Sequence, residues 1–409
     1  MLFVQKFGGT SVGSVERIQH VAERVAKRAA SGHKLVVVVS AMSGETDRLL
    51  QLASAVSSEP DPREVDALVS TGEQVAAALL AMTLKSMGTP ARSMSGTQLG
   101  LRTDGRFSRA RIRTMDRGVV DAALDAGEVV VATGFQGIDG AGNVTTLGRG
   151  GSDTSAVAIA AALDADECEI YTDVLGVYTA DPRICPDATK LNVISFEEMM
   201  EMASQGSKVL QIRAVELAMN HGVPLRVRST FSDDAGTLVK AEDDQIERLV
   251  VRGVSHNTNE VKVTVRGVPD HPGVASRLFK ALADAAINVD VIVQNKSLEG
   301  ITDLSFTVER TDQGQTEKIA QAFNDSIEAG GVEVDPNIAK VSVVGVGMRA
   351  HPGVAAATFE ALSEAEVNIQ MISTSEIKIT CVVDESEVAA AARALHRKFE
   401  LHQGGIVAQ

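Results

Sequence analysis

The sequence predicts an α/β open sheet sandwiched by helices, followed by two smaller ferredoxin-like modules of βαββαβ order. Short apolar runs alternate with helical stretches over residues 1–245, which is typical of a helix-covered sheet. The last third of the chain contains an internal repeat with a different order of elements. At 409 residues the chain also exceeds one ordinary core, so two or three domains are expected.

The strands expected in the first region are short and apolar, and they are Leu2–Gln5, Leu35–Ser40, Glu128–Thr133, Glu169–Thr172 and Leu225–Ser229. An amphipathic helix follows the first strand and stops at Gly32; its apolar face consists of Val15, Ile18, Val21, Ala22 and Val25. In such sheets, ligands bind at the carboxyl ends of strands, beside helix N-termini. We therefore expect the site at that edge.

The repeat in the last third aligns Lys262–Val268 with Lys340–Val346. The His-Pro-Gly-Val-Ala run at 271–275 recurs at 351–355, with two residues inserted in the second copy. Each copy reads strand, Pro-Gly turn, helix, strand, strand, helix. The second copy lacks a final strand, which Leu249–Val254 could supply. The predicted domains are 1–245, 262–338 and 340–409, the last with 249–254 available to complete it.

Charge and composition exclude several functions. A net charge of −15 argues against general binding to nucleic acid or anionic membranes, and the absence of Trp removes most stacking platforms. No apolar run approaches the length needed to cross a bilayer, and the longest strand-like run is Leu35–Val39. Met1–Lys6 is too short for a signal peptide. Three scattered cysteines fit reduced thiols, so a cytoplasmic location is expected.

The first motif is Val4–Ser11, a strand that runs into Gly8-Gly9 and then a helix. Paired glycines let backbone N–H groups approach phosphate, and a helix N-terminus favours negative charge. Lys6 at the strand end could reach a transferring phosphoryl group. A tight turn with a solvated lysine explains this motif alone about equally well. The G-x-x-x-x-G-K-[ST] spacing of a Walker A loop is missing.

Two further motifs carry polar groups at expected strand ends. Thr146–Thr154 crowds three glycines, an arginine and an aspartate before the apolar helix Ser155–Leu163, which favours a binding loop over a simple connection. Tyr171–Arg183 supplies hydroxyls, carboxylates, an aromatic ring and a basic group. Tyr178 could equally pack beneath the sheet.

Together these motifs resemble the amino-acid kinase family. The resemblance rests on Lys6–Ser11, Leu147–Asp153, Thr172–Arg183 and Gly206–Leu210. The repeats resemble ACT domains, which are small ligand-sensing modules. With Val38–Met42 and Ser70–Glu73, they narrow the resemblance to the aspartokinase family over nearly the entire chain.

The resemblance implies transfer of the ATP γ-phosphoryl group to the side-chain carboxylate of L-aspartate. The product is 4-phospho-L-aspartate, the first step towards lysine, threonine and methionine. This nucleophile is ionised at pH 7, so no general base is required. Catalysis must come from positioning and from neutralising the charge of two anions. The expected cofactors are ATP and Mg²⁺, and no residue is assigned as a direct metal ligand.

The resemblance also assigns the site residues. Lys6 and Asp153 are the catalytic pair, Asp153 orienting Lys6 or the metal shell. The expected ATP contacts are Lys6, Phe7, Gly8, Gly9, Ser40, Ser152, Thr172, Asp173, Tyr178, Asp181, Arg183 and Lys208. The expected aspartate contacts are Ser40, Thr46, Glu73, Arg149, Gly150, Gly151 and Ser152. Arg149 would take the α-carboxylate in a bidentate pair, and Glu73 the α-ammonium.

The repeats are expected to bind regulatory amino acids, lysine and/or threonine, and to mediate a homo-oligomer or association with a regulatory subunit. The expected effector contacts are Asp270, Gly273, Val274, Ala275, Asn288, Asp290, Gln294, Ser373, Thr374, Ser375 and Glu376. Two alternatives stay open. One is a kinase of another amino-acid carboxylate, such as a glutamate derivative. The other is an amino-acid sensor with an inactive kinase domain.

Overall fold

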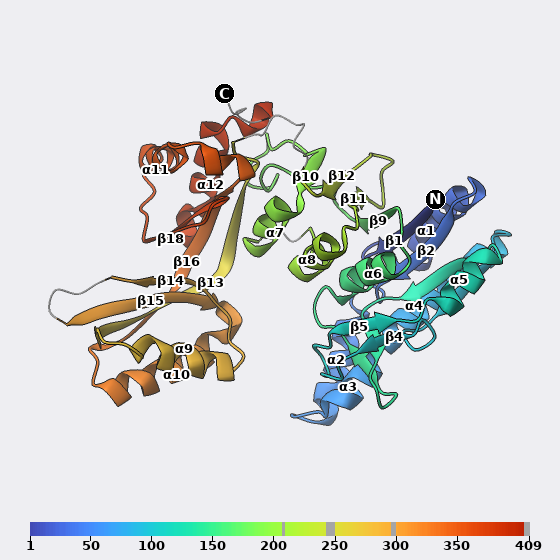
Figure 1. Cartoon of the computed structure of the whole chain (residues 1–409), viewed down its shortest axis with the longest axis horizontal. Helices are drawn as coiled ribbons and strands as arrows, with labels where there is room; N and C mark the ends of the chain where they lie inside the picture. The colour runs from blue at the N-terminus through green and yellow to red at the C-terminus, as the bar shows by residue number, and fades with distance from the viewer. Residues whose placement is uncertain (207–208, 243–249, 296–299, 405–409) are drawn as a thin grey trace. The chain divides into compact units, whose positions relative to one another are not determined.

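The computed structural model describes residues 1–206, 209–242, 250–295 and 300–404, which form two compact units (Figure 1). The first unit contains residues 1–177, 190–203 and 209–242. The second contains 178–189, 204–206 and the described residues from 250 onwards. Part of the region expected to form one continuous first domain therefore belongs to the second unit.

The large sheet of the first unit has the order β10-β12-β11-β9-β1-β2-β6-β3. Its strands are β1 (Leu2–Phe7), β2 (Lys34–Val39), β3 (Ala91–Met94), β6 (Val129–Thr133), β9 (Glu167–Thr172), β10 (Val193–Ser195), β11 (Leu225–Ser229) and β12 (Thr237–Lys240). Every strand expected in this region is present, with β1 and β9 longer than expected. Because β1 runs parallel to both β2 and β9, these three strands end at one edge.

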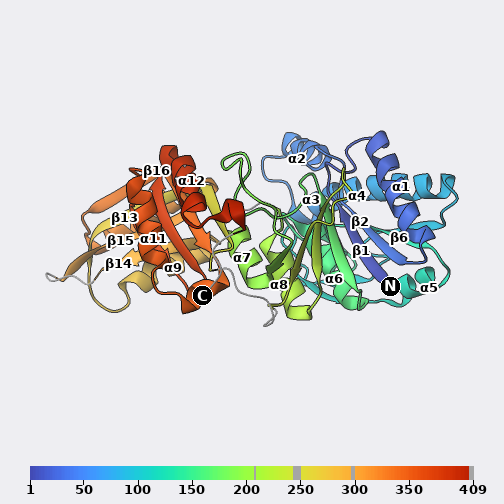
Figure 2. The same ribbon diagram turned by 90° about the horizontal axis from the view of Figure 1, so that it is seen from above.

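Helices cover both faces of this sheet (Figure 2). The helices between residues 1 and 242 are α1 (Val15–Ala30), α2 (Glu45–Val56), α3 (Pro62–Val69), α4 (Thr71–Ser86), α5 (Gly118–Asp125), α6 (Gly151–Ala162), α7 (Phe196–Ser204) and α8 (Ile212–His221). Alternate residues of β1 and β2, such as Phe3 and Val37, pack with α1 and α4 in one apolar core. Val4 and Val36 are buried on the other side, where α6 contacts both strands. The strands are thus buried on both faces, which explains their nearly continuous apolar sequence.

A smaller sheet of order β5-β4-β7-β8 lies beside α3 and α6. Its strands are β4 (Leu101–Thr103), β5 (Ile112–Met115), β7 (Gln136–Ile138) and β8 (Val144–Thr146). The turn after β8 leads into α6, so this sheet holds the Gly148–Gly151 loop beside the strand ends of the large sheet.

The second unit is built on one sheet of order β14-β15-β13-β16-β18-β17. Its strands are β13 (Gly253–Pro269), β14 (Val289–Gln294), β15 (Ile301–Glu309), β16 (Gly331–Val344), β17 (Met371–Thr374) and β18 (Lys378–Asp384). Two of them, β13 and β16, run through both repeats. Gly253–Asn257 pairs with Lys340–Val344, at the edge that the second repeat leaves without a strand. The extra strand expected at 249–254 begins later, at Gly253, and Leu249 lies outside the described residues.

Each repeat of the second unit also has its own helices and core. The helices are α9 (Val274–Asp284), α10 (Gln313–Ile327), α11 (Val354–Glu364) and α12 (Val388–Lys398), with the short 3₁₀ helices η1 (Arg310–Asp312), η2 (Val346–Ala350), η3 (Glu385–Glu387) and η4 (Leu401–Gln403). Leu278 and Leu282 of α9 belong to the first core, and Leu362 and Leu395 belong to the second. A smaller cluster containing Val291, Ile338 and Met371 joins the two repeats.

Residues Pro62–Ser86, which span α3 and α4, form one stretch long and apolar enough to cross a membrane by length and composition. Half of its most apolar window is buried inside the protein, as it is in the core helices of globular proteins. In the structure, Ala76, Leu80 and Leu84 pack in the same core as β1 and β2. By length and composition, this stretch contradicts the expectation that no apolar run approaches the length needed to cross a bilayer.

Candidate active site

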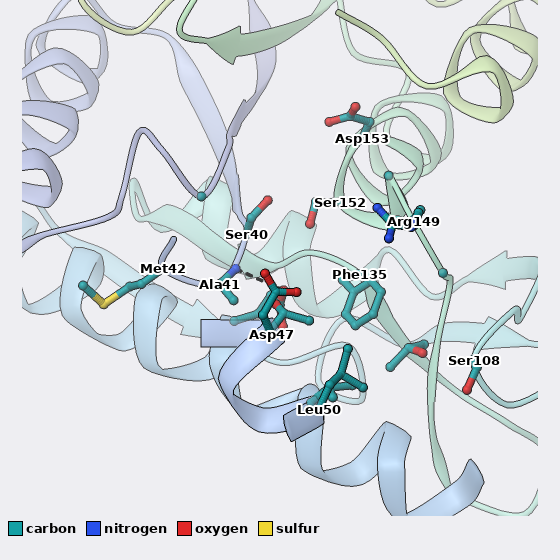
Figure 3. Close-up of a pocket in the computed structure, with 18 of the residues that line it drawn as sticks. Ser40, Ala41, Met42, Asp47, Leu50, Ser108, Phe135, Arg149, Ser152 and Asp153 are labelled. Atoms are coloured by element: carbon teal, nitrogen blue, oxygen red, sulfur yellow. Dashed lines mark hydrogen bonds between the residues drawn. The ribbon is translucent and has the colours of Figure 1, made fainter. Parts of the chain in front are cut away.

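A cavity of about 670 Å³ opens in the first unit at the carboxyl ends of β1 and β2 (Figure 3). Its wall is formed by Lys6, Gly9, Ser40, Ala41, Met42, Ser43, Gly44, Thr46, Asp47, Leu50, Val65, Asp66, Val69, Glu73, Ser108, Phe135, Thr146, Gly148, Arg149, Gly150, Gly151, Ser152, Asp153 and Gln211. Ten of the predicted site residues are among them, including both catalytic candidates and every predicted aspartate contact.

Lys6 and Asp153 form an ion pair in this wall. Lys6 follows the middle of β1, and its Nζ lies 2.6 Å from Asp153 Oδ1 in the first turn of α6. Both side chains are largely buried, with 13% and 9% of their areas exposed. A short, water-poor ion pair fixes the ammonium in one position. The ion pair places Asp153 where it would orient Lys6, which is one of the two roles expected for it.

Glu73 lies in the first turn of α4 and is 3% exposed. Its Oε1 accepts a hydrogen bond of 3.0 Å from the Ala41 N–H, whereas its Oε2 is buried and has no hydrogen-bond partner among the described residues. Desolvation raises the pKa of Glu73 to about 7, against the lowering effect of the Ala41 N–H. Gly72 permits this approach, because a Cβ there would lie 2.8 Å from the Ala41 side chain.

Arg149 projects from the turn between β8 and α6, and its side chain is exposed on the cavity wall. Figure 3 shows Arg149 among the labelled side chains that line the cavity. The glycines on either side have left-handed φ angles, +79° at Gly148 and +68° at Gly150. A Cβ on Gly150 would overlap the Gln211 side chain. Glycine is therefore required for backbone conformation and for space.

Sequence reasoning missed the group that shapes the cavity floor. Asp66 is fully buried and accepts hydrogen bonds from the backbone N–H groups of Ser108 and Thr146 and from both hydroxyls. Ser108 and Phe135, which also line the cavity, adopt left-handed φ angles of 64° and 68°. Such strain in non-glycine residues is found where surrounding structure holds a site in place. Asp66 is thus a positioning residue.

Several expected ATP contacts are not in this wall. Phe7 is buried and stacks on Tyr171, and the Gly8 N–H donates to the Tyr171 carbonyl. The Gly8 N–H thus has a backbone partner in this structure, because β1–β9 pairing continues into the loop. Thr172 and Asp173 lie at the end of β9 and bond each other.

The remaining ATP candidates lie elsewhere in the chain. Tyr178, Asp181 and Arg183 belong to the second unit, where Asp181 and Arg183 form an ion pair of 2.7 Å. Lys208 lies outside the described residues. The structure therefore brings together the aspartate candidates and the catalytic pair but not the full set of nucleotide candidates.

The effector candidates lie in both repeats. Asp270, Gly273, Val274 and Ala275 surround the start of α9, where Gly273 has a φ of +94°. Asn288 precedes β14, and Gln294 ends it. Ser373, Thr374, Ser375 and Glu376 follow β17, and Glu376 pairs with Arg349 at 3.1 Å. Asp290 forms an ion pair with Lys340, so its carboxylate already has a charged partner.

Comparison with known proteins now places the chain. The model of the amino acid kinase family matches residues 1–229, and models of the ACT domain match residues 263–328 and 341–399. The fold and the cavity thus define an amino acid kinase followed by two ACT domains. This confirms the predicted fold class.

An aspartokinase of Pseudomonas aeruginosa is 55% identical over 402 residues, covering 98% of each chain. Escherichia coli aspartokinase III in complex with aspartate and ADP, in its R-state, has a TM-score of 0.80 at 26% identity and covers 98% of this chain and 100% of its own. The T-state complex of that enzyme with lysine and aspartate has a TM-score of 0.76 at 27% identity, covering 97% and 99%. The chain belongs to the aspartokinase family.

Proposed function

We propose that this chain uses ATP to phosphorylate the side-chain carboxylate of L-aspartate, and that its two ACT domains regulate the reaction. The observation that carries the proposal is the cavity wall. Glu73 offers there a buried carboxylate oxygen that has no hydrogen-bond partner among the described residues, and an exposed arginine and the Lys6–Asp153 pair line the same cavity. Family membership supports the same activity.

Aspartate carries three charged groups, and the cavity offers a complement to each. Arg149 binds the α-carboxylate with two parallel N–H donors. Glu73 Oε2 accepts a hydrogen bond from the α-ammonium, which gives this buried oxygen a partner that none of the described residues provides. Ser40, Thr46 and Ser152 supply hydroxyls along the wall between them. The side-chain carboxylate is left to face the reacting phosphoryl group.

Lys6 supplies the charge stabilisation for this reaction. The carboxylate nucleophile is ionised at neutral pH, and the barrier lies in bringing it up to an anionic triphosphate. The Lys6 ammonium, fixed by Asp153, is preorganised to neutralise the charge shared by the attacking oxygen and the γ-phosphoryl group. Ser152, at the N-terminus of α6, adds a helix end that favours negative charge.

Mg²⁺ fits this donor set as an ion held mainly by phosphate oxygens and water. Mg²⁺ takes one or two protein carboxylates and keeps several waters in nucleotide sites. Asp153 is the carboxylate closest to Lys6, and Asp66 is fully used by backbone and hydroxyl donors. When bound, the ion would neutralise β- and γ-phosphate charge. Our proposed nucleotide contacts remain Lys6, Phe7, Gly8, Gly9, Ser40, Ser152, Thr172, Asp173, Tyr178, Asp181, Arg183 and Lys208.

The ACT domains bind lysine and/or threonine in this proposal. E. coli aspartokinase III binds lysine in its T-state structure, which supports an amino-acid effector here. The N-terminus of α9, which follows the left-handed Gly273, suits an effector carboxylate because a helix N-terminus favours negative charge. We further propose that these domains pair between subunits or with a regulatory subunit, and that the protein works in the cytoplasm.

The test is ADP release from ATP and Mg²⁺ with a panel of amino acids. We expect release with L-aspartate and at least a hundredfold less with L-glutamate or N-acetyl-glutamate, with hydroxylamine trapping an acyl phosphate. A preference for a glutamate derivative would favour another carboxylate kinase. No release with any amino acid, together with tight effector binding, would favour a sensor with an inactive kinase domain.

A further inference from the structure

Three metal-ligating side chains meet in the second unit, away from the groups used above. They are Asp187, His396 and His402, and each offers a ligand atom within 4.8 Å of the other two. His396 lies near the end of α12, and His402 lies in η4, which follows that helix. Asp187 comes from the segment Tyr178–Thr189, more than two hundred residues earlier in the chain.

The two imidazoles are held so that one nitrogen of each remains unused. His396 is 1% exposed, and its Nε2 lies 2.9 Å from Thr179 Oγ1. His402 Nε2 lies 3.0 Å from the Gln403 side-chain amide. The Nδ1 atoms of both rings are buried and have no hydrogen-bond partner among the described residues. Since an unpaired buried polar atom costs free energy, two in one cluster call for a ligand.

We propose that Asp187, His396 and His402 bind a divalent transition-metal ion, with Zn²⁺ as the best match. Two imidazoles and one carboxylate form a ligand set that Zn²⁺ accepts, leaving a fourth position for water. The Thr179 hydroxyl on the far nitrogen of His396 is the kind of partner that fixes the tautomer of a ligating histidine. Asp187 is exposed, so an ion can enter from solvent.

Such an ion would fasten the Tyr178–Thr189 segment to the second ACT domain. That segment is already linked there, because the Val254 N–H donates to the Thr179 carbonyl and Thr189 Oγ1 donates to the Leu401 carbonyl. Cys185 of the same segment is buried in the domain core. An ion bound by Asp187, His396 and His402 would add a further link between this segment and the domain, at the solvent-exposed Asp187. The bound ion therefore stabilises the second unit by mass action.

A single buried water is the competing occupant, because it could also bond both Nδ1 atoms. Direct metal titration separates the two. Full-length protein, freed of metal with a chelator, is titrated with Zn²⁺ by calorimetry and with Co²⁺ by visible absorption. We expect one ion per chain, the intense Co²⁺ bands of a four-coordinate site, and a higher melting temperature with Zn²⁺.

Variants then assign the site. Asp187→Asn and His402→Asn should each weaken Zn²⁺ binding at least tenfold, while His271→Asn, an exposed histidine of the first ACT domain, should leave it unchanged. Asp187→Asn is the decisive variant, because the side chain is exposed and its loss should not unfold the protein. Absence of stoichiometric binding, or equal affinity in Asp187→Asn and the parent, would overturn the proposal and leave water as the occupant.

Discussion

Glu73 is the residue whose chemistry depends most on its surroundings. Desolvation raises the pKa of Glu73 from 4.5 to about 7. Between these two pH values the folded protein keeps a proton on Glu73 that the unfolded chain has lost. Stability from this group is therefore greatest below pH 4.5 and is lost as the pH rises through about 7, a change on the order of 3 kcal/mol. A substrate ammonium at Oε2 would favour the ionised form of Glu73. Binding would thus offset part of the stability that the folded protein loses when Glu73 ionises.

We therefore predict that kcat/KM for aspartate increases as the pH rises through about 7 and then levels off. The reason is that only ionised Glu73 holds the α-ammonium. The measurement is a pH profile at saturating ATP. Glu73→Gln should give a lower kcat/KM that is flat across this window. An unchanged profile in that variant would show that another group controls it.

The Lys6–Asp153 pair leads to a second prediction. Lys6→Ala should lower kcat by several orders of magnitude with a much smaller change in ATP affinity, because Lys6 acts on charge that develops in the transition state. Asp153→Asn should also lower kcat, since Lys6 loses the carboxylate that orients it. Lys85→Ala, at an exposed position on α4, is the control. Normal turnover with weak ATP binding in Lys6→Ala would contradict this role.

Residues whose role comes from local sequence were predictable, and those whose role comes from distant contacts were not. Lys6, Glu73 and Arg149 stand in short glycine-containing motifs at strand or helix ends. Asp66 belongs to an ordinary amphipathic helix, and its function depends on donors 42 and 80 positions later. Phe135 has a left-handed φ in the structure. The sequence offered only a weak hint of this site, namely the Gly134-Phe135 pair in the turn between two strands.

At the scale of elements, the strands of the first unit were predictable because each is an apolar run bounded by turn residues. The shared strands β13 and β16 were not. An alignment of the two repeats divides β13 and β16 at the boundary between the modules. In the structure, the backbone pairing of β13 with β16 continues across that boundary. Tyr178–Thr189 was placed in the first region by sequence order, but its Thr179 contacts a histidine 217 positions later.

The start of α9 carries the prediction on regulation. Asp270→Ala should abolish inhibition by lysine or threonine while uninhibited turnover stays nearly normal, because α9 and its flanks contain none of the catalytic groups. Asp290→Ala is a poorer test, since it removes an ion-pair partner from Lys340, which is 1% exposed. Asp284→Ala, at the other end of α9, is the matched control.

The outcome of that test is read from inhibition curves at fixed substrate. A coupling free energy of roughly 1–3 kcal/mol corresponds to a change in activity from several-fold to over a hundredfold. Retained inhibition in Asp270→Ala would place the effector elsewhere. A parent enzyme that neither amino acid affects, alone or together, would leave the ACT domains with a role in assembly only.

At the scale of the whole molecule, the two units contain different groups. The first unit contains the Lys6–Asp153 pair and the cavity for the amino acid, and the second contains two ACT domains joined through one sheet. The segment Tyr178–Thr189 belongs to the second unit and carries three of the proposed nucleotide contacts.

We propose above all that the cavity of the first unit binds the α-carboxylate and the α-ammonium of aspartate. The variant Arg149→Lys tests this most directly. Lysine keeps the charge but cannot form the bidentate pair, which at about 1.5–3 kcal/mol predicts a KM for aspartate raised roughly tenfold to a hundredfold. The KM for ATP should hardly change, and Arg109→Lys, an exposed arginine outside the cavity wall, should behave as the parent. An increase confined to the KM for ATP would contradict the claim and assign this end of the cavity to the nucleotide.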